Sequence, residues 1–117
     1  MKPSSAKAKG RTLQKLVVSF ILRLFPSLTK RDVVSTSMGA TGADIKLSEN
    51  AFKIFPFAIE CKNLSKFSVY QHYEQAKSHS KKEGGIPLLV IKQNRSEPLA
   101  ILSLADFLHY VNKSKND

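Results

Sequence analysis

The sequence is poor in cysteine, in long apolar runs and, over its first third, in acidic residues. One cysteine among 117 residues excludes an internal disulfide and fits a reducing compartment, so we expect a cytoplasmic protein. No apolar stretch approaches the roughly 18 residues that a membrane span needs. Residues 16–22 follow basic residues as in a signal peptide, but Arg23 interrupts the apolar run and no small-residue cleavage site follows closely. We therefore expect a core helix here and no membrane association.

Acidic residues are absent from residues 1–31, and this absence makes the charge uneven. Eight lysines and arginines give that segment +8, whereas the remaining 11 bases and 9 acids give +2. A net charge of +10 indicates a polyanionic partner, with nucleic acid first and an anionic membrane surface second. The alternative is a solubilising tail. We expect a flexible basic arm over 1–10, a single domain over 11–117, and DNA contacts from four basic residues: Lys7, Lys9, Arg11 and Lys15.

The order of predicted elements is helix, three strands, helix, two strands, helix (αβββαββα), which is typical of an α/β fold with a mixed β-sheet flanked by helices. The first helix runs from Thr12 until Pro26 ends it. A capping box of Ser68 with Gln71 predicts the start of another helix, which Gly84 closes, and Ser103 with Asp106 is expected to cap the last helix. The predicted strands lie at residues 32–36, 44–48, 57–62, 86–91 and 99–102.

An apolar run that ends in charged residues is the most informative motif. Strand alternation over residues 57–62 places Glu60 and Lys62 on one face, with Ile59 and Cys61 on the other. A carboxylate and an ammonium group at the end of an apolar strand are costly to desolvate unless they are paired or bound to a metal. A metal-dependent phosphodiesterase site would explain their presence.

The element order, with Asp44 opening the second strand and Glu60-x-Lys62 on the third, resembles the PD-(D/E)xK nuclease superfamily. The sequences of residues 37–44 and 55–63 are similar to those of a small phage-encoded branch of this superfamily, which is labelled Holliday-junction-resolvase-like. The resemblance implies a restriction-endonuclease-like core and an Mg²⁺-dependent DNA endonuclease for which Mn²⁺ substitutes. It also implies branched DNA as substrate, 5′-phosphate and 3′-hydroxyl products, a symmetric homodimer, and the host cell cytoplasm as the compartment.

The same resemblance assigns roles to individual residues. Asp44 and Glu60 would be metal ligands, together with the backbone carbonyl of Cys61, whose side chain would point into the core. Lys62 would orient or deprotonate the attacking water and stabilise the transition state. Gln75, in the middle of a helix, would lie near the scissile phosphate. The expected catalytic set is therefore Asp44, Glu60, Lys62 and Gln75.

One departure from the family pattern concerns the first helix, where many members carry a metal-site glutamate. This chain has no acid before Asp32, and Gln14 occupies the corresponding stretch. Its amide oxygen could support the metal site directly or through water, but it brings no charge. A site with two carboxylates should hold one ion more readily than two. Ser37, in the small-residue loop before Asp44, is a candidate phosphate contact.

Several alternatives stay open. Gln14 can be a solvated helix residue, and Gln75 a surface polar residue. The three histidines are more typical of exposed surface residues than of a zinc site: His72, His79 and His109. A nuclease acting on linear, nicked or single-stranded DNA, and a catalytically inactive DNA-binding module on the same fold, are the alternative functions.

Overall fold

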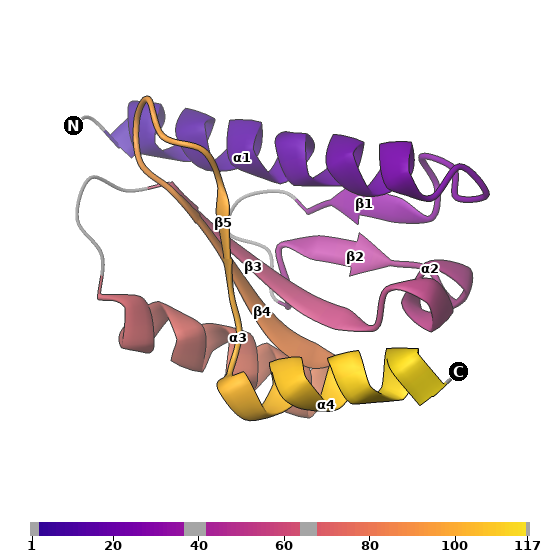
Figure 1. Ribbon diagram of the computed structural model, residues 1–117. Helices are drawn as coiled ribbons and strands as arrows, with labels where there is room; N and C mark the ends of the chain where they lie inside the picture. Colours follow the sequence, from indigo (N-terminus) through magenta and orange to yellow (C-terminus); the bar gives the residue numbers. More distant parts are fainter. Residues whose placement is uncertain (1–2, 37–41, 64–67, 117) are drawn as a thin grey trace.

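The computed structural model describes residues 3–36, 42–63 and 68–116 (Figure 1). Its elements, in chain order, are α1 (Pro3–Leu24), β1 (Val33–Ser35), β2 (Ile45–Leu47), α2 (Glu49–Ile54), β3 (Phe57–Asn63), α3 (Val69–Glu83), β4 (Ile86–Lys92), β5 (Leu99–Ile101) and α4 (Leu104–Asn116). The expected α/β class, with a mixed β-sheet flanked by helices, is confirmed. The element order differs from the expected αβββαββα by one short helix, α2, between β2 and β3.

The strands form two hydrogen-bonded groups that meet at one residue. Strands β3 and β4 pair in parallel and β5 pairs antiparallel with β4, while β1 and β2 form a separate antiparallel pair. The backbone N–H of Asp44 donates to the carbonyl of Ile59 at 3.1 Å, so the chain just before β2 lies alongside β3. Asp44 therefore stands at the junction of the two groups.

Helices α1 and α3 cover opposite faces of the larger sheet (Figure 1). Beneath α1 lies the main apolar core, to which β3 contributes Phe57, Ile59 and Cys61. Leu13 and Val17 of α1 pack into the same cluster. Burial of this face supplies most of the hydrophobic stabilisation, because it removes large aliphatic side chains from water.

Helix α1 starts earlier than the sequence predicted. We expected a flexible arm over residues 1–10, but the helix begins at Pro3 and includes residues 3–10. Proline is favoured at the first position of a helix, and the alanines and lysines that follow are strong helix formers. Residues 3–10 were not predicted to be helical because their sequence has no apolar periodicity. Within the described chain, no helix is both long and apolar enough to cross a bilayer.

The two predicted helix caps have different outcomes. The hydroxyl of Ser103 accepts a 3.0 Å hydrogen bond from the Asp106 N–H at the start of α4, as predicted. Ser68 precedes α3, but its side chain makes no capping hydrogen bond, so the predicted capping box is wrong. At the other end of α3, Gly85 has a φ of 94°, and a Cβ there would lie 3.1 Å from the Ala58 backbone nitrogen. Glycine therefore allows the close approach of this turn to β3.

Candidate functional site

The side chain of Asp44 is fixed by the backbone of β3. Its Oδ2 accepts a 2.8 Å hydrogen bond from the Cys61 N–H, one rung beyond the backbone bond between Asp44 and Ile59. The carboxylate thus replaces a backbone carbonyl as the acceptor of the next hydrogen bond along β3. This bond holds the half-buried carboxylate beside β3.

Glu60 and Lys62 lie on the α3 side of β3, as the alternation predicted. Glu60 is only 4% exposed, and Lys62 is half-buried at the end of the same strand. Ile59 and Cys61 point to the opposite, apolar side and belong to the core beneath α1. The predicted burial of the Cys61 side chain is confirmed, and burial raises the pKa of its thiol. A buried thiol with a raised pKa is a poor nucleophile.

Helix α3 brings two histidines over this strand, and sequence reasoning missed both. His79 Nδ1 lies 3.0 Å from Glu60 Oε1, and the His79 side chain is 24% exposed. His72, two turns earlier, is partly buried. This burial is the main cause that lowers its pKa, and the positive charge of Lys62 lowers it further. The expectation of exposed surface histidines is therefore wrong for these two and confirmed for His109.

A helical period of 3.6 could have revealed this pair. His72, Gln75, Ala76 and His79 recur at the spacing of one face of α3, and Ala76 is 1% exposed. The buried alanine marks the face that meets the sheet. His72 and His79 lie about one turn before and one turn after Ala76, so they face β3 on the side that carries Glu60 and Lys62.

The two carboxylates share a site that disfavours their ionisation. Burial is the largest cause that raises the pKa of Asp44, and the hydrogen bond from Cys61 and the charge of Lys62 partly oppose it. Burial also raises the pKa of Glu60, the negative charge of Asp44 raises it further, and His79 and Lys62 lower it. Two neighbouring buried carboxylates that repel each other favour a cation between them.

The oxygen atoms next to Asp44 are candidate ligands for a hard divalent cation. Among the described residues there is no group of three or more His, Cys, Asp or Glu side chains that could hold a metal ion. The candidate donors are therefore limited to two carboxylates, those of Asp44 and Glu60, and the backbone carbonyl of Cys61. In an extended strand, the N–H and C=O of one residue point to the same side. Because the Cys61 N–H points to Asp44, its carbonyl does too. Oxygen donors of this kind suit Mg²⁺ or Mn²⁺.

The C-terminal end of α3 contacts the chain just before Asp44. Glu83 Oε1 lies 3.1 Å from Lys46 Nζ, and Glu83 Oε2 accepts a 3.5 Å hydrogen bond from the Ala43 N–H. Helix α3 therefore touches β3 through His79 and the start of β2 through Glu83.

Three further residues were predicted to belong to the site: Gln14, Gln75 and Ser37. Gln14 is 2% exposed within α1, so its interpretation as a solvated helix residue is wrong. Gln75 is exposed on α3, one turn before His79 and on the same side of the helix. Ser37 lies outside the described residues.

The four predicted DNA-binding residues lie on the first half of α1. Lys7, Arg11 and Lys15 are exposed and spaced by four residues, so they lie on one side of the helix. Lys9 is partly buried. The ion pairs of the described chain are those of Lys46 with Glu83, Lys77 with Glu74 and His79 with Glu60, and none of them involves these cations.

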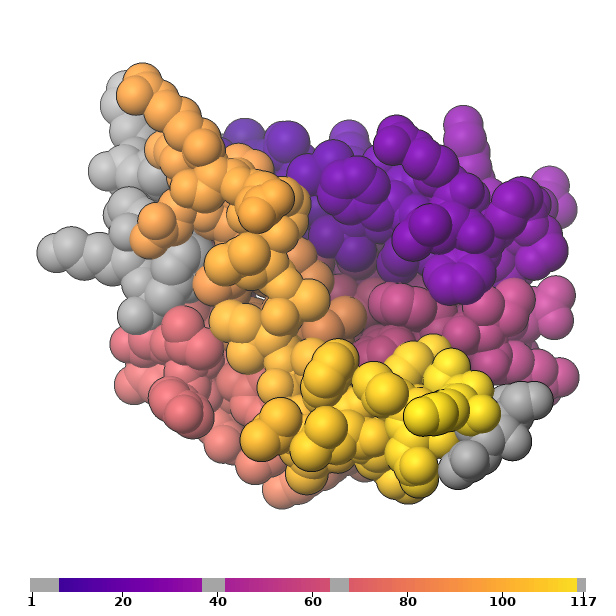
Figure 2. All heavy atoms as spheres, in the orientation of Figure 1, coloured from indigo at the N-terminus to yellow at the C-terminus, as the bar shows by residue number. Residues whose placement is uncertain are grey.

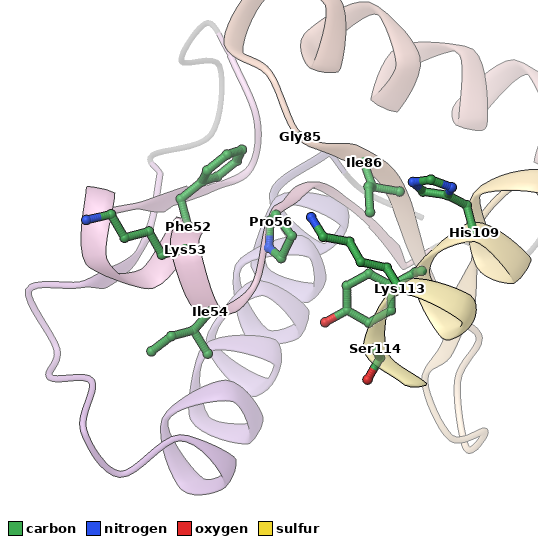
Figure 3. Close-up of a pocket in the computed structure, with 10 residues that line it drawn as sticks. Phe52, Lys53, Ile54, Pro56, Gly85, Ile86, His109, Lys113 and Ser114 are labelled. Carbon is green, nitrogen blue, oxygen red and sulfur yellow. The ribbon is translucent and has the colours of Figure 1, made fainter. Parts of the chain in front are cut away.

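A separate hollow of about 440 Å³ lies between α2 and α4, away from the carboxylates (Figure 3). Lys113 extends into it towards Pro56, and His109 lies beside Ile86. Asp44, Glu60 and Lys62 are not among its lining residues. The charged residues of β3 therefore lie outside this hollow.

Comparison of the chain with protein-family models, with curated proteins and with solved structures finds no match.

Proposed function

We propose that this protein is a metal-dependent endonuclease that hydrolyses phosphodiester bonds in DNA. One observation carries the proposal: Asp44 Oδ2 accepts a 2.8 Å hydrogen bond from the Cys61 N–H, so the Asp44 carboxylate lies against β3 at the residue between Glu60 and Lys62. Two carboxylates with an adjacent ammonium group are the side chains that metal-assisted phosphodiester hydrolysis needs. The restriction-endonuclease-like fold suggested by the sequence belongs to the same proposal.

Asp44, Glu60 and the Cys61 carbonyl would hold the ion, which supplies a Lewis acid for the phosphate when it is bound. Lys62 would orient the attacking water and offset negative charge as it develops on the phosphate. His79 would hold the Glu60 carboxylate in one orientation through the 3.0 Å contact. Gln75, exposed one turn away, would contact the DNA backbone beside the scissile bond.

Branched DNA is the proposed substrate, cut to leave 5′-phosphate and 3′-hydroxyl ends. The cations along α1 would contact phosphates and would make binding depend on charge and shape more than on base sequence. A homodimer would present two sites to two strands of a junction.

A panel of DNA substrates at fixed salt tests the proposal. A four-way junction, a flap, a duplex and a single strand would each be incubated with Mg²⁺, Mn²⁺, Ca²⁺ or a chelator, and products would be separated on denaturing gels. We expect cleavage with Mg²⁺ and Mn²⁺, fastest on the junction, and none with the chelator. Lys62→Ala should cleave at least ~100-fold more slowly and keep binding. Lys53→Ala replaces an exposed lysine on α2 and should cleave as wild type does.

The second candidate is a DNA-binding module without catalytic activity. It is favoured by the absence of an acidic residue from α1, which leaves two side-chain carboxylates in the site. This candidate predicts that wild type and Lys62→Ala bind the junction equally and that neither nicks any DNA form with any of the ions. Cleavage by wild type alone would exclude it.

A further inference from the structure

The turn that joins β4 to β5 holds an arginine in a strained backbone conformation. The Ser96 N–H donates a 3.1 Å hydrogen bond to the carbonyl of Gln93, so residues 93–96 form a β-turn. Arg95 is the third residue of this turn and has a φ of 65°. It is the only residue other than glycine with a positive φ in the part of the chain that the structure describes. A positive φ brings the Cβ close to the following carbonyl, so glycine or asparagine is usual at this position of a turn.

No ion pair of the described chain includes the Arg95 side chain. Arg95 is exposed, and Glu97, two residues later, belongs to none of these pairs either. The turn is instead held by the Gln93 carbonyl, which accepts a second hydrogen bond from Lys92 Nζ at 3.3 Å. Residues in strained conformations persist where the surrounding structure fixes them, and they are concentrated at functional sites. The strain at this position therefore indicates that the Arg95 side chain acts on something outside the chain.

The register of β3 and β4 places this turn at the edge of the sheet that carries the carboxylates. The two strands are parallel, and Lys62 pairs with Ile91, four residues before Arg95. Four residues span at most about 14 Å and neighbouring strands lie about 4.8 Å apart, so the Cα atoms of Lys62 and Arg95 are at most about 15 Å apart. The turn lies at the same end of the molecule as the end of β3 (Figure 1), and Figure 2 shows it projecting from the molecular surface.

The charged residues of this edge favour a phosphate as the ligand of Arg95. Lys62 and Lys92 lie at the ends of β3 and β4, and Arg95 follows them in the turn. A guanidinium group donates two parallel hydrogen bonds to a phosphate in a fixed geometry. A turn that is held by its own hydrogen bonds limits the directions in which this group points. A DNA strand that runs along the edge would therefore meet a further cation beyond Lys62.

We propose that Arg95 binds a backbone phosphate of the DNA strand that enters the carboxylate site. The inference rests on the proposed nuclease function and adds a DNA contact outside both the metal site and α1. Because successive nucleotides of one strand rise by about 3.4 Å, a separation of about 15 Å places the contacted phosphate within about five nucleotides of the cleaved bond. Arg95 thus fixes where the strand crosses the edge of the sheet, and its contribution to binding should not depend on base sequence.

DNA-binding measurements in a chelator test the contact with a matched pair of variants. Arg95 and Arg31 are both exposed arginines in turns, and Arg31 lies in the turn that precedes β1. We expect Arg95→Ala to bind a four-way junction about 10-fold more weakly than wild type and to reduce the slope of log affinity against log salt by about 1. Arg31→Ala should match wild type in both quantities, and Arg95→Lys should keep the slope because it keeps the charge.

Arg95→Gly separates the backbone strain from the DNA contact. Glycine adopts a positive φ without the clash of a Cβ, so this variant should unfold at a higher urea concentration than Arg95→Ala and at one no lower than wild type. It should nevertheless bind DNA as weakly as Arg95→Ala does. Urea denaturation and fluorescence anisotropy of the same preparations measure the two quantities.

Junctions in which a single phosphate is replaced by an uncharged methylphosphonate locate the contact. At one position within about five nucleotides of the bond that wild type cleaves in Mg²⁺, the replacement should weaken wild-type binding about 10-fold and leave Arg95→Ala binding unchanged. Equal binding by wild type, Arg95→Ala and Arg95→Gly, or the absence of such a position, would overturn the inference. Wild-type cleavage is scored separately. Without it the nuclease proposal fails even where Arg95→Ala binds weakly, whereas cleavage with an undiminished Arg95→Ala affinity overturns the contact alone.

Discussion

The two faces of β3 are built by alternate residues of one strand, and they differ in both packing and charge. Towards α1, Phe57, Ile59 and Cys61 join an apolar cluster. Towards α3, Glu60 and Lys62 meet histidines. The difference shows how period-2 alternation lets one short strand pack into the core with one face and carry the charged residues of the candidate site on the other. A substitution on one face should therefore leave the property of the other face largely intact.

The largest effect is expected from Lys62→Ala on the α3 face. In the proposed nuclease, removal of the ammonium group should lower the rate of junction cleavage by ~100-fold or more, because negative charge developing on the phosphate would lose a positively charged side chain. The free energy of unfolding should change little, since Lys62 is half-buried outside the apolar cluster. Cleavage kinetics and chemical denaturation of the same preparation measure the two quantities. A loss of stability that matches the loss of rate would contradict the division between the faces.

Ile59→Ala on the α1 face should have the complementary effect. Ile59 is 0% exposed, and its truncation should lower the free energy of unfolding by ~2–5 kcal/mol through lost burial and a residual cavity. Urea denaturation measures the loss. Below the unfolding transition, Mg²⁺ affinity should stay near that of wild type, as titration calorimetry can show. A large loss of Mg²⁺ affinity in a folded variant would show that the faces are coupled.

Replacing the Glu60 carboxylate by an amide, in Glu60→Gln, should raise the free energy of unfolding of the metal-free protein by ~1 kcal/mol at neutral pH. The pKa of Glu60 is raised, chiefly by burial, so the folded state binds this proton more tightly than the unfolded state does. Stability due to Glu60 therefore falls as pH rises above its ordinary pKa of 4.5, and the deficit is complete above the raised value. Glu60→Gln should thus melt higher than wild type at neutral pH, with an advantage that shrinks towards pH 4.5.

Thermal melts of both proteins across this pH range, in a chelator, measure the difference. Added Mg²⁺ should stabilise wild type more than Glu60→Gln, because the ion offsets the repulsion between carboxylates. A wild-type protein that is more stable than the variant at neutral pH without metal would contradict the assigned cause.

The smallest expected effect is on the salt dependence of DNA binding, and it concerns the exposed side of α1 that faces away from the apolar cluster. Arg11→Ala and Lys15→Ala should each reduce the slope of log affinity against log salt by about 1, because each removes one phosphate contact. Stability should stay within about 0.5 kcal/mol of wild type, since both side chains are exposed. Fluorescence anisotropy with duplex DNA at several salt concentrations measures the slope, and Lys53→Ala is the exposed control. An unchanged slope would place the DNA contact elsewhere.

The sequence predicted the strands and the charged face of β3 because both follow from local periodicity. The residues of β3 and β4 form short apolar runs. Alternation along β3 is enough to place Glu60 and Ile59 on opposite faces of the strand. The histidines of α3 were missed because their contacts depend on how a helix is placed over a strand that is distant in the sequence. The start of α1 was missed because residues 3–10 have helix propensity without an apolar pattern. The solvated alternative for Gln14 was wrong because a polar side chain is not necessarily exposed.

Helix α3 joins the two parts of the chain that carry the carboxylates. Through His79 it holds Glu60, and one turn later, through Glu83, it reaches the backbone next to Asp44. A displacement of this helix would therefore change the separation of the two acidic groups. In the proposed metal site it would also change the size of ion that fits, so occupancy of that site and the position of a single helix would be mechanically linked.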